Sequence, residues 1–174
     1  GVVLGGGGGH TVSYINSGGW IGFMVNSCRN TVRYSNGSGP FAGFIVGGKR
    51  NDIHHNTASN ASYGISIFGE GNIARQNDTT TSVGVYVNGS GHVVENNGAV
   101  GGLVGFIVES ATGVDMKQNE VSGAARGISV RNSSDLDIDN NVVRGNADTG
   151  IYANGISNSQ IRRNETVSNG MHGV

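Results

Sequence analysis

A short motif recurs along the whole chain: a glycine followed by an apolar residue, any residue and a second apolar residue. The copies begin at Gly1, Gly22, Gly43, Gly64, Gly84, Gly105, Gly127 and Gly150. Successive glycines are 20 to 23 residues apart, and a ninth copy starts at Gly173. A fixed period of this length is typical of a solenoid, in which each repeat forms one unit stacked on its neighbours.

An asparagine returns with the same period. The positions are Asn16, Asn36, Asn56, Asn77, Asn97, Asn119, Asn141 and Asn164. The apolar positions alternate and Gly or Asn interrupts every few residues, which indicates two or three strands of about three to five residues per period and no helix. We expect the asparagines to form a ladder, because stacked carboxamides can donate to and accept from each other. Asn also tolerates the left-handed backbone of a sharp bend.

Coiling allows such a chain to bury its apolar side chains, with each coil paired in parallel to the next about 4.8 Å away. We therefore predict an all-β fold, a single-stranded parallel β-helix of about eight coils that forms one domain over residues 1–174. One inner column is predicted to contain Phe23, Phe44, Ile65, Val85, Phe106, Ile128 and Ile151. A second contains Val25, Val46, Ile67, Val87, Val108, Val130 and Ala153.

The stretch NNVVRGNADTGIYANGISNSQIRRNETVSNGMHG resembles the repeats of right-handed parallel β-helices. That group includes pectate lyases, bacterial mannuronan C5-epimerases and the periplasmic NosD-like proteins. The resemblance covers essentially the whole chain and implies a right-handed helix with three sheets and, often, an extracellular polysaccharide substrate. The epimerases carry an Asp-Pro-His motif, whereas the single proline here is Pro40 in GSGPFAG. Its absence argues against epimerase activity; we do not expect an enzyme, and if the chain is one, the resemblance implies a polysaccharide lyase or epimerase.

Charge and hydropathy exclude several classes of protein. The formal net charge is −1, which provides no electrostatic attraction for nucleic acid. No apolar run approaches the 18 residues or so of a membrane span. Cys28 is the only cysteine and cannot form an internal disulfide. These features and the resemblance predict a secreted or cell-surface protein.

Candidate catalytic residues lie two positions before the asparagines. This column contains Tyr14, Tyr34, His54, Arg75, Glu95, Lys117, Asp139 and Arg162. If it faces outward, His54 or the adjacent His55 could act as a base and Arg75 could neutralise a uronate, with Tyr34 beside them. The candidate carbohydrate-binding residues are Tyr14, Tyr34, Lys49 and Arg50. The alternative is a solvated face on which the charges alternate in sign.

The register of this strand stays open. It can be anchored on Val12, Val32, Ile73 and Val93, or one residue later on Ile53, Met116, Ile138 and Ile161. A slip of one residue exchanges the inner and outer faces. Tyr14 and Tyr34 are therefore alternatively core residues.

Acidic residues alternate in SDLDIDN, at Asp135, Asp137 and Asp139, and Asp115 is expected to stack near Asp137. Clustered carboxylates can hold Ca²⁺, so Asp115 and Asp137 are candidate metal ligands. No calcium-loop spacing accompanies them, which favours surface acids instead. No other cofactor is predicted.

The outward position at the centre of each glycine-led strand is largely apolar. The predicted interface residues at this position are Met24, Ile45, Tyr86, Ile107 and Tyr152. A continuous apolar stripe along a rod indicates a contact surface. Neither end of the chain shows an evident cap, which predicts end-to-end association or a section of a longer chain. We expect a structural β-solenoid that forms homo-oligomers, filaments or part of a fibrous surface protein; the alternative is a domain that binds or modifies a polyuronate.

Overall fold

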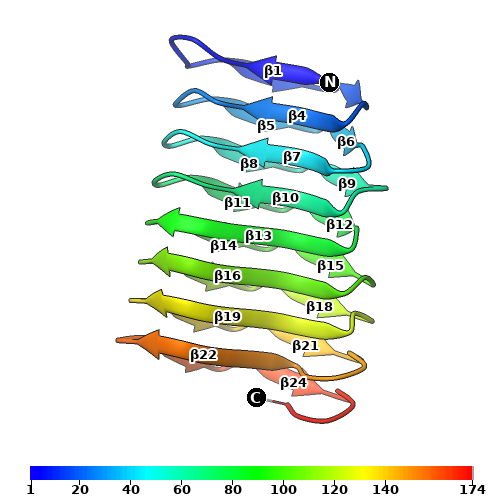
Figure 1. Cartoon of the computed structure of the whole chain (residues 1–174), viewed down its shortest axis with the longest axis vertical. Coiled ribbons are helices and arrows are strands. Elements are labelled where there is room, and N and C mark those ends of the chain that lie inside the picture. The colour runs from blue at the N-terminus through cyan, green and yellow to red at the C-terminus, as the bar shows by residue number, and fades with distance from the viewer. Residues whose placement is uncertain (174) are drawn as a thin grey trace.

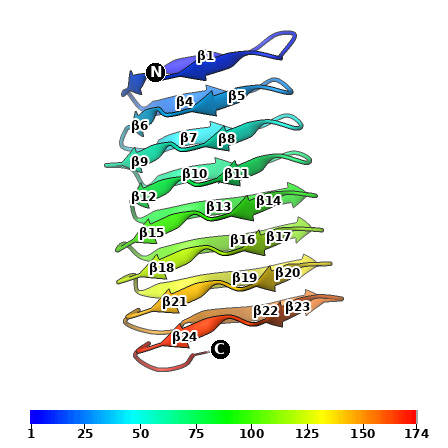
Figure 2. The ribbon, with the colours of Figure 1, turned by 180° about the vertical axis from the view of Figure 1, so that it is seen from behind.

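Each repeat folds into one coil of three short strands, and the coils stack along a common axis (Figures 1 and 2). The structure is a computed structural model that describes residues 1–173. Three sheets run along the rod, and each takes one strand from every coil. The prediction of an all-β parallel β-helix with about eight coils is confirmed, since residues 1–173 form strands and turns without a helix.

Sheet A is built from the glycine-led motifs, and all neighbouring strands in it are parallel. Its strands are β1 (Val2–Leu4), β4 (Ile21–Val25), β7 (Ala42–Val46), β10 (Tyr63–Ile67), β13 (Val83–Ser90), β16 (Val104–Thr112), β19 (Arg126–Ser134) and β22 (Ile151–Ser157). The two predicted inner columns are in register and buried, except that Ala153 in the last strand is exposed. Phe23 and Phe44 stack at the start of the first column, with ring centroids 4.7 Å apart.

Sheet B contains the strands whose register the sequence left open. They are β2 (Thr11–Ser13), β5 (Thr31–Arg33), β8 (Asp52–His54), β11 (Ile73–Arg75), β14 (Val93–Glu95), β17 (Asp115–Lys117), β20 (Asp137–Asp139) and β23 (Gln160–Arg162). The inward column mixes the two anchor sets and contains Val12, Val32, Ile53, Ala74, Val94, Met116, Ile138 and Ile161. Ile73 and Val93 are therefore on the outer face, where each is half-buried.

Sheet C completes each coil with small inward residues. Its strands are β3 (Asn16–Ser17), β6 (Asn36–Ser38), β9 (Thr57–Ser59), β12 (Asp78–Thr80), β15 (Gly98–Val100), β18 (Glu120–Ser122), β21 (Val142–Arg144) and β24 (Glu165–Val167). The recurring glycines of sheet A lie against these residues. A Cβ atom on Gly84 would lie 2.5 Å from the carbonyl oxygen of Gly105 and 2.7 Å from the Cβ of Ala99. The glycine recurs because nothing larger fits where sheets A and C meet.

A ladder of asparagines occupies the corner between sheets B and C. Its members are Asn56, Asn77, Asn97, Asn119, Asn141 and Asn164. The Nδ2 of Asn77 donates to the Oδ1 of Asn97 at 2.9 Å, and the backbone N–H of Asn77 donates to the same oxygen at 3.1 Å. The Nδ2 of Asn97 also donates to the carbonyl oxygen of Ala74 in the preceding coil at 2.9 Å. The ladder thus satisfies the polar groups of a buried corner.

The prediction was wrong for Asn16 and Asn36, which are exposed and lie one residue beyond the ladder position. Ser35 occupies that position in its coil, where its backbone N–H donates to the Oδ1 of Asn56 at 3.0 Å. The left-handed backbone conformation at this corner was expected for the ladder asparagine, but another residue adopts it. His55 has a φ of 55°, so the bend is made by the residue just before the ladder asparagine. The asparagine itself is free to turn its side chain inward.

A second ladder, which the sequence analysis missed, lies at the corner between sheets A and B. The Nδ2 of Asn30 donates to the Oδ1 of Asn51 at 2.9 Å, and Asn51 donates likewise to Asn72 at 3.0 Å. His92 ends this ladder, because its Nδ1 accepts the backbone N–H of Asn72 at 3.1 Å. The spacing of 21 residues between the three asparagines was the signal that could have revealed it.

Candidate functional site

The outer face of sheet B carries a ladder of ion pairs. Arg75 binds Asp52 of the preceding coil through two hydrogen bonds, Nε to Oδ1 at 3.2 Å and Nη2 to Oδ2 at 2.8 Å. Further along the rod, the Nζ of Lys117 lies 3.0 Å from the Oδ2 of Asp137, and Arg162 contacts the same oxygen at 3.1 Å. These pairs join adjacent coils. The guanidinium of Arg75 is therefore already bound to a carboxylate.

The predicted catalytic residues are only partly brought together. His54 and Arg75 are neighbours in the register of sheet B, whereas Tyr34 is replaced in that column by Arg33. His54 is buried, and its Nδ1 lies 2.9 Å from the Nδ1 of His55. Burial lowers the pKa of His54 below its ordinary value, although the carboxylate of Asp52 acts in the opposite direction. The imidazole of His54 therefore contacts the ring of its own neighbour in the chain.

Tyr14 and Tyr34 belong neither to that column nor to the core. Both occupy the left-handed corner position between sheets B and C, with φ of 59° and 50°. Their rings stack at 5.3 Å with 75% and 43% of their surface exposed, and the ring of His55 follows 4.9 Å from Tyr34. The reason is spacing: in the first two coils one more residue separates the inward valine from the asparagine.

Lys49 and Arg50, the other candidate carbohydrate-binding residues, lie at the opposite edge of sheet B. Lys49 forms an exposed ion pair with Glu70, with Nζ and Oε2 2.6 Å apart. Arg50 is the left-handed residue of the same corner, with a φ of 57°. The structure thus separates these two residues from the tyrosines.

The candidate metal ligands Asp115 and Asp137 are adjacent in register, as expected. The Nζ of Lys117 lies 3.4 Å from an oxygen of Asp115 and 3.0 Å from an oxygen of Asp137. Within residues 1–173 no three His, Cys, Asp or Glu side chains are grouped so that they could hold a metal ion. The two carboxylates are joined by an ammonium group rather than arranged as ligands.

A strip of aromatic rings, here called the aromatic strip, lies on sheet A and on the corner that leads into it. Trp20 and Phe41 stack with ring centroids 6.2 Å apart, and Phe41 meets the edge of Tyr63 at 5.9 Å. Tyr63 meets Tyr86 edge-on at 6.0 Å, and Phe68 lies 5.7 Å from Tyr86. The strip crosses adjacent coils along the rod axis. Trp20 is 69% exposed and Phe41 is 40% exposed.

Four rings of the aromatic strip, from Phe41, Tyr63, Phe68 and Tyr86, line a hollow of about 330 Å³. Ser66 provides its floor, because this small side chain stands between the larger Ile45 and Tyr86 in the same outward column. The hydroxyl of Tyr86 donates to the Oε2 of Glu109 at 3.4 Å. Burial, followed by the charge of Glu109, raises the pKa of Tyr86. The sequence analysis placed Ile45 and Tyr86 outward correctly but did not assign Phe41, Phe68 or Glu109 to a site.

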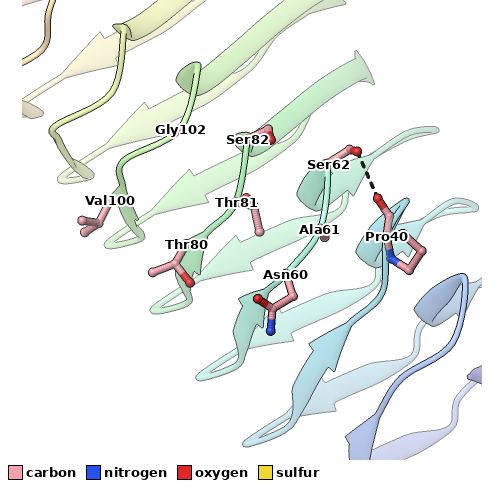
Figure 3. A pocket seen from close by; sticks show the side chains of 9 residues that line it. All are labelled: Pro40, Asn60, Ala61, Ser62, Thr80, Thr81, Ser82, Val100 and Gly102. Carbon is pink, nitrogen blue, oxygen red and sulfur yellow. Dashed lines mark hydrogen bonds between the residues drawn. The ribbon is translucent and has the colours of Figure 1, made fainter.

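A shallow groove follows the corner between sheets C and A (Figure 3). Its volume is about 470 Å³, and its lining is mainly hydroxyl and amide groups, from Asn60, Ser62, Thr80, Thr81 and Ser82. The Oγ of Ser62 donates to the carbonyl oxygen of Pro40 at 3.0 Å. The groove borders the aromatic strip, since Pro40 precedes Phe41 in the chain. Polar and aromatic surfaces therefore adjoin along this side of the rod.

Comparison with known proteins identifies one family. The family described as periplasmic copper-binding protein (NosD) matches residues 9–173. Among curated proteins and among solved structures, no chain matches this one. None of the described residues forms a helix that is long and apolar enough to cross a membrane.

Proposed function

Because the chain belongs to the NosD family, we propose that it is a β-helical binding scaffold outside the cytoplasm, and that the outer face of sheet A binds a polysaccharide. The description of the family as periplasmic agrees with the predicted location outside the cytoplasm. The observation that carries the proposal is the aromatic strip from Trp20 to Phe68, with the hydroxyl-lined groove beside it.

The family description also names copper, and the described residues do not fit a copper site. Copper is held by converging imidazole nitrogens and by thiolate or thioether sulfurs. Among residues 1–173, no group of three or more His, Cys, Asp or Glu side chains is placed to hold a metal ion. The ring nitrogens of the buried His92 are bonded to Asn72 and Asn88, and the Nδ1 atoms of His54 and His55 contact each other. The proposed function therefore gives copper no role.

An aromatic strip suits a sugar chain for a physical reason. A sugar ring presents an apolar face of C–H groups and a rim of hydroxyl groups. Aromatic side chains bury large areas against such a face, and Tyr adds a polar end. The strip supplies rings at intervals of about 6 Å along the rod. The adjoining corner groove supplies hydroxyl and amide partners for the rim.

Binding to a panel of neutral and acidic polysaccharides tests the proposal, with retardation in affinity gels as the readout. The substitution Trp20→Ala or Tyr63→Ala is expected to weaken polysaccharide binding about three- to ten-fold, because each substitution removes one ring contact. Tyr14→Ala is the matched control, since Tyr14 is an exposed aromatic residue on a different corner. Binding by no member of the panel, or equal losses in Tyr14→Ala and Tyr63→Ala, would overturn the proposal.

Lateral self-association is the second candidate, because the apolar face of sheet A extends beyond the aromatic strip. The outward column contains Val3, Met24, Ile45, Ser66, Tyr86, Ile107, Ser129 and Tyr152 in continuous register. A face of eight strands and about five residues covers about 600 Å². Two such faces together reach the lower limit of a stable interface, which is about 1,200 Å² in total.

Sedimentation of the chain at increasing concentration distinguishes the two candidates. If sheet A pairs with a second copy, Ile107→Asp should shift the chain to monomer, whereas Gln160→Asp on sheet B should not. Electron microscopy at high concentration should then show elongated or bundled particles. A chain that stays monomeric at every concentration would remove this candidate while leaving polysaccharide binding intact.

A further inference from the structure

The hollow on sheet A has an unusual chemical composition. Four aromatic rings line it, from Phe41, Tyr63, Phe68 and Tyr86. The charged residue in the lining is Glu109, and no basic side chain accompanies it there. Aromatic rings carry negative charge on their faces, so four such rings beside one carboxylate favour a positively charged ligand.

The carboxylate of Glu109 has no cation of its own within residues 1–173. It forms none of the ion pairs of the described chain. Its neighbour in register on β19 is Arg131, but that guanidinium lies 5.7 Å from the ring centre of Tyr152 instead. The hydrogen bond from Tyr86 to Glu109 is long, at 3.4 Å. A positive charge would therefore find this carboxylate available.

We propose that the hollow binds an organic cation, a substituted ammonium group seated among the rings and facing Glu109. Aromatic faces attract a cation within about 6 Å, and most strongly where water is displaced. A substituted ammonium holds its hydration shell weakly and can leave water, whereas Ca²⁺ requires six to eight oxygen ligands that the hollow lacks. The volume of about 330 Å³ accommodates a head group or a side chain rather than a large ligand.

The elements that hold the rings favour a preformed site. Tyr63, Ser66 and Tyr86 are on adjacent parallel strands, β10 and β13, with Tyr63 paired to Val83 and Ser66 paired to Tyr86. Phe68 follows β10 directly, and its backbone N–H donates to the carbonyl oxygen of Val46 at 2.8 Å. Backbone pairing thus fixes most of the rings before any ligand arrives. Little ordering remains for binding to impose.

Titration of choline into the purified chain, followed by isothermal calorimetry and by aromatic NMR shifts, tests the site. We expect saturable binding with a dissociation constant on the order of 1 mM or below. The neutral isostere 3,3-dimethylbutan-1-ol has the same shape and should bind at least about ten-fold more weakly, because it lacks the charge. Equal affinity for both ligands would show a merely apolar hollow and would overturn the proposal, as would the absence of saturable choline binding.

Variants place the binding at the hollow. Glu109→Gln keeps the shape of the side chain and should weaken choline binding about five- to ten-fold, and Phe68→Leu should weaken it by removing one ring. Glu120→Gln is the matched control, because Glu120 is paired with Arg144 on the opposite side of the coil. Unchanged choline binding in Glu109→Gln would overturn the proposal.

Separate titrations of three ligands identify the natural source of the cation. Free choline, phosphatidylcholine vesicles and an amino-sugar oligomer are each titrated against wild type and Glu109→Gln. A source that binds in the hollow must bind the variant less well, and if all three bind both proteins equally the proposal fails. The inference stands apart from polysaccharide binding. Glu109→Gln leaves Trp20 and Phe41 intact. A variant that loses choline binding but still binds a neutral polysaccharide would show that the two binding activities are separate.

Discussion

Asn97 accepts two hydrogen bonds on one oxygen, from the backbone N–H and from the Nδ2 of Asn77, while its own Nδ2 donates to Ala74 and Asn119. Asn97→Ala removes all four contacts within a buried corner. It leaves both donors of Asn77 without this acceptor, and each unsatisfied buried group costs about 1–3 kcal/mol. We expect a loss of about 2–4 kcal/mol in the free energy of unfolding, measured by urea denaturation.

The matched control is Asn36→Ala. Asn36 is the same type of residue and recurs with the same period, but it is exposed, and its side-chain Nδ2 donates to the Oδ1 of the exposed Asn16 at 2.7 Å. Its loss should stay below about 1 kcal/mol. If Asn97→Ala and Asn36→Ala lowered the free energy of unfolding equally, the burial of the ladder would not explain why it stabilises the protein.

The glycine column predicts a steric result. Gly84→Ala would place a methyl group 2.5 Å from the carbonyl oxygen of Gly105, in the contact between sheets A and C. Overpacking of this kind costs about 1–3 kcal/mol, because neither backbone can withdraw without breaking its strand pairs. Gly7→Ala should change stability little, since its Cβ would meet no atom within 4 Å. Thermal unfolding of the two variants measures the difference.

His92 predicts a dependence of stability on pH. Burial lowers the pKa of His92 below its ordinary value of 6.5, although the hydrogen bond between Nε2 and the carbonyl oxygen of Asn88 acts in the opposite direction. As the pH falls through about 6.5, the unfolded chain takes up a proton that the folded chain still excludes. The free energy of unfolding should therefore fall by up to about 1.4 kcal/mol per pH unit until the lowered pKa is reached.

The variant His92→Asn isolates this contribution. Asn51 and Asn72 each donate Nδ2 to the carbonyl oxygen four residues earlier, and His92 makes the same contact with Asn88 through Nε2. An asparagine can thus continue the ladder without titrating. Urea denaturation between pH 7 and pH 5 should give a smaller slope for His92→Asn than for wild type, and the remaining slope would include His54. If wild type and His92→Asn gave identical slopes, protonation of a residue other than His92 would cause the pH dependence of stability.

Sheet A was predictable because its signal is redundant. Each repeat has a glycine followed by two inward apolar residues at a nearly constant period, so only one assignment of inward and outward residues fits. Sheet B was not, because its strands are only three residues long and some are apolar on both faces. In β11 the small Ala74 points inward and the larger Ile73 points outward. Hydrophobicity alone favours Ile73, whereas strand pairing aligns Ala74 with the inward residues Ile53 and Val94.

The position of Tyr14 and Tyr34 could be predicted from the spacing of the residues around them, although not from hydrophobicity. Asn56 follows Ile53 by three positions in the chain, whereas Asn36 follows Val32 by four. That difference moves Tyr34 from the strand to the corner. The aromatic strip depends on information of another kind, because Phe41 and Phe68 flank their strands and meet Tyr63 and Tyr86 only once adjacent coils are aligned.

The ion-pair ladder on sheet B predicts a small and salt-dependent effect. Hydrogen bonds from Arg162, and then from Lys117, lower the pKa of Asp137. Its stabilising contribution is therefore complete above the ordinary carboxyl range and is lost as the pH falls through the lowered pKa. Because the side chains are partly exposed, Asp137→Asn should lower the free energy of unfolding at pH 7 by less than about 1 kcal/mol.

Salt distinguishes this contribution from packing. In 1 M NaCl the Debye length falls to about 3 Å, so the difference between wild type and Asp137→Asn should shrink. Asp135→Asn is the matched control, because Asp135 forms no ion pair in the described chain and its left-handed backbone, with φ of 56°, suits asparagine. A loss above about 2 kcal/mol that persists in high salt would mean that Asp137 acts as a buried partner instead.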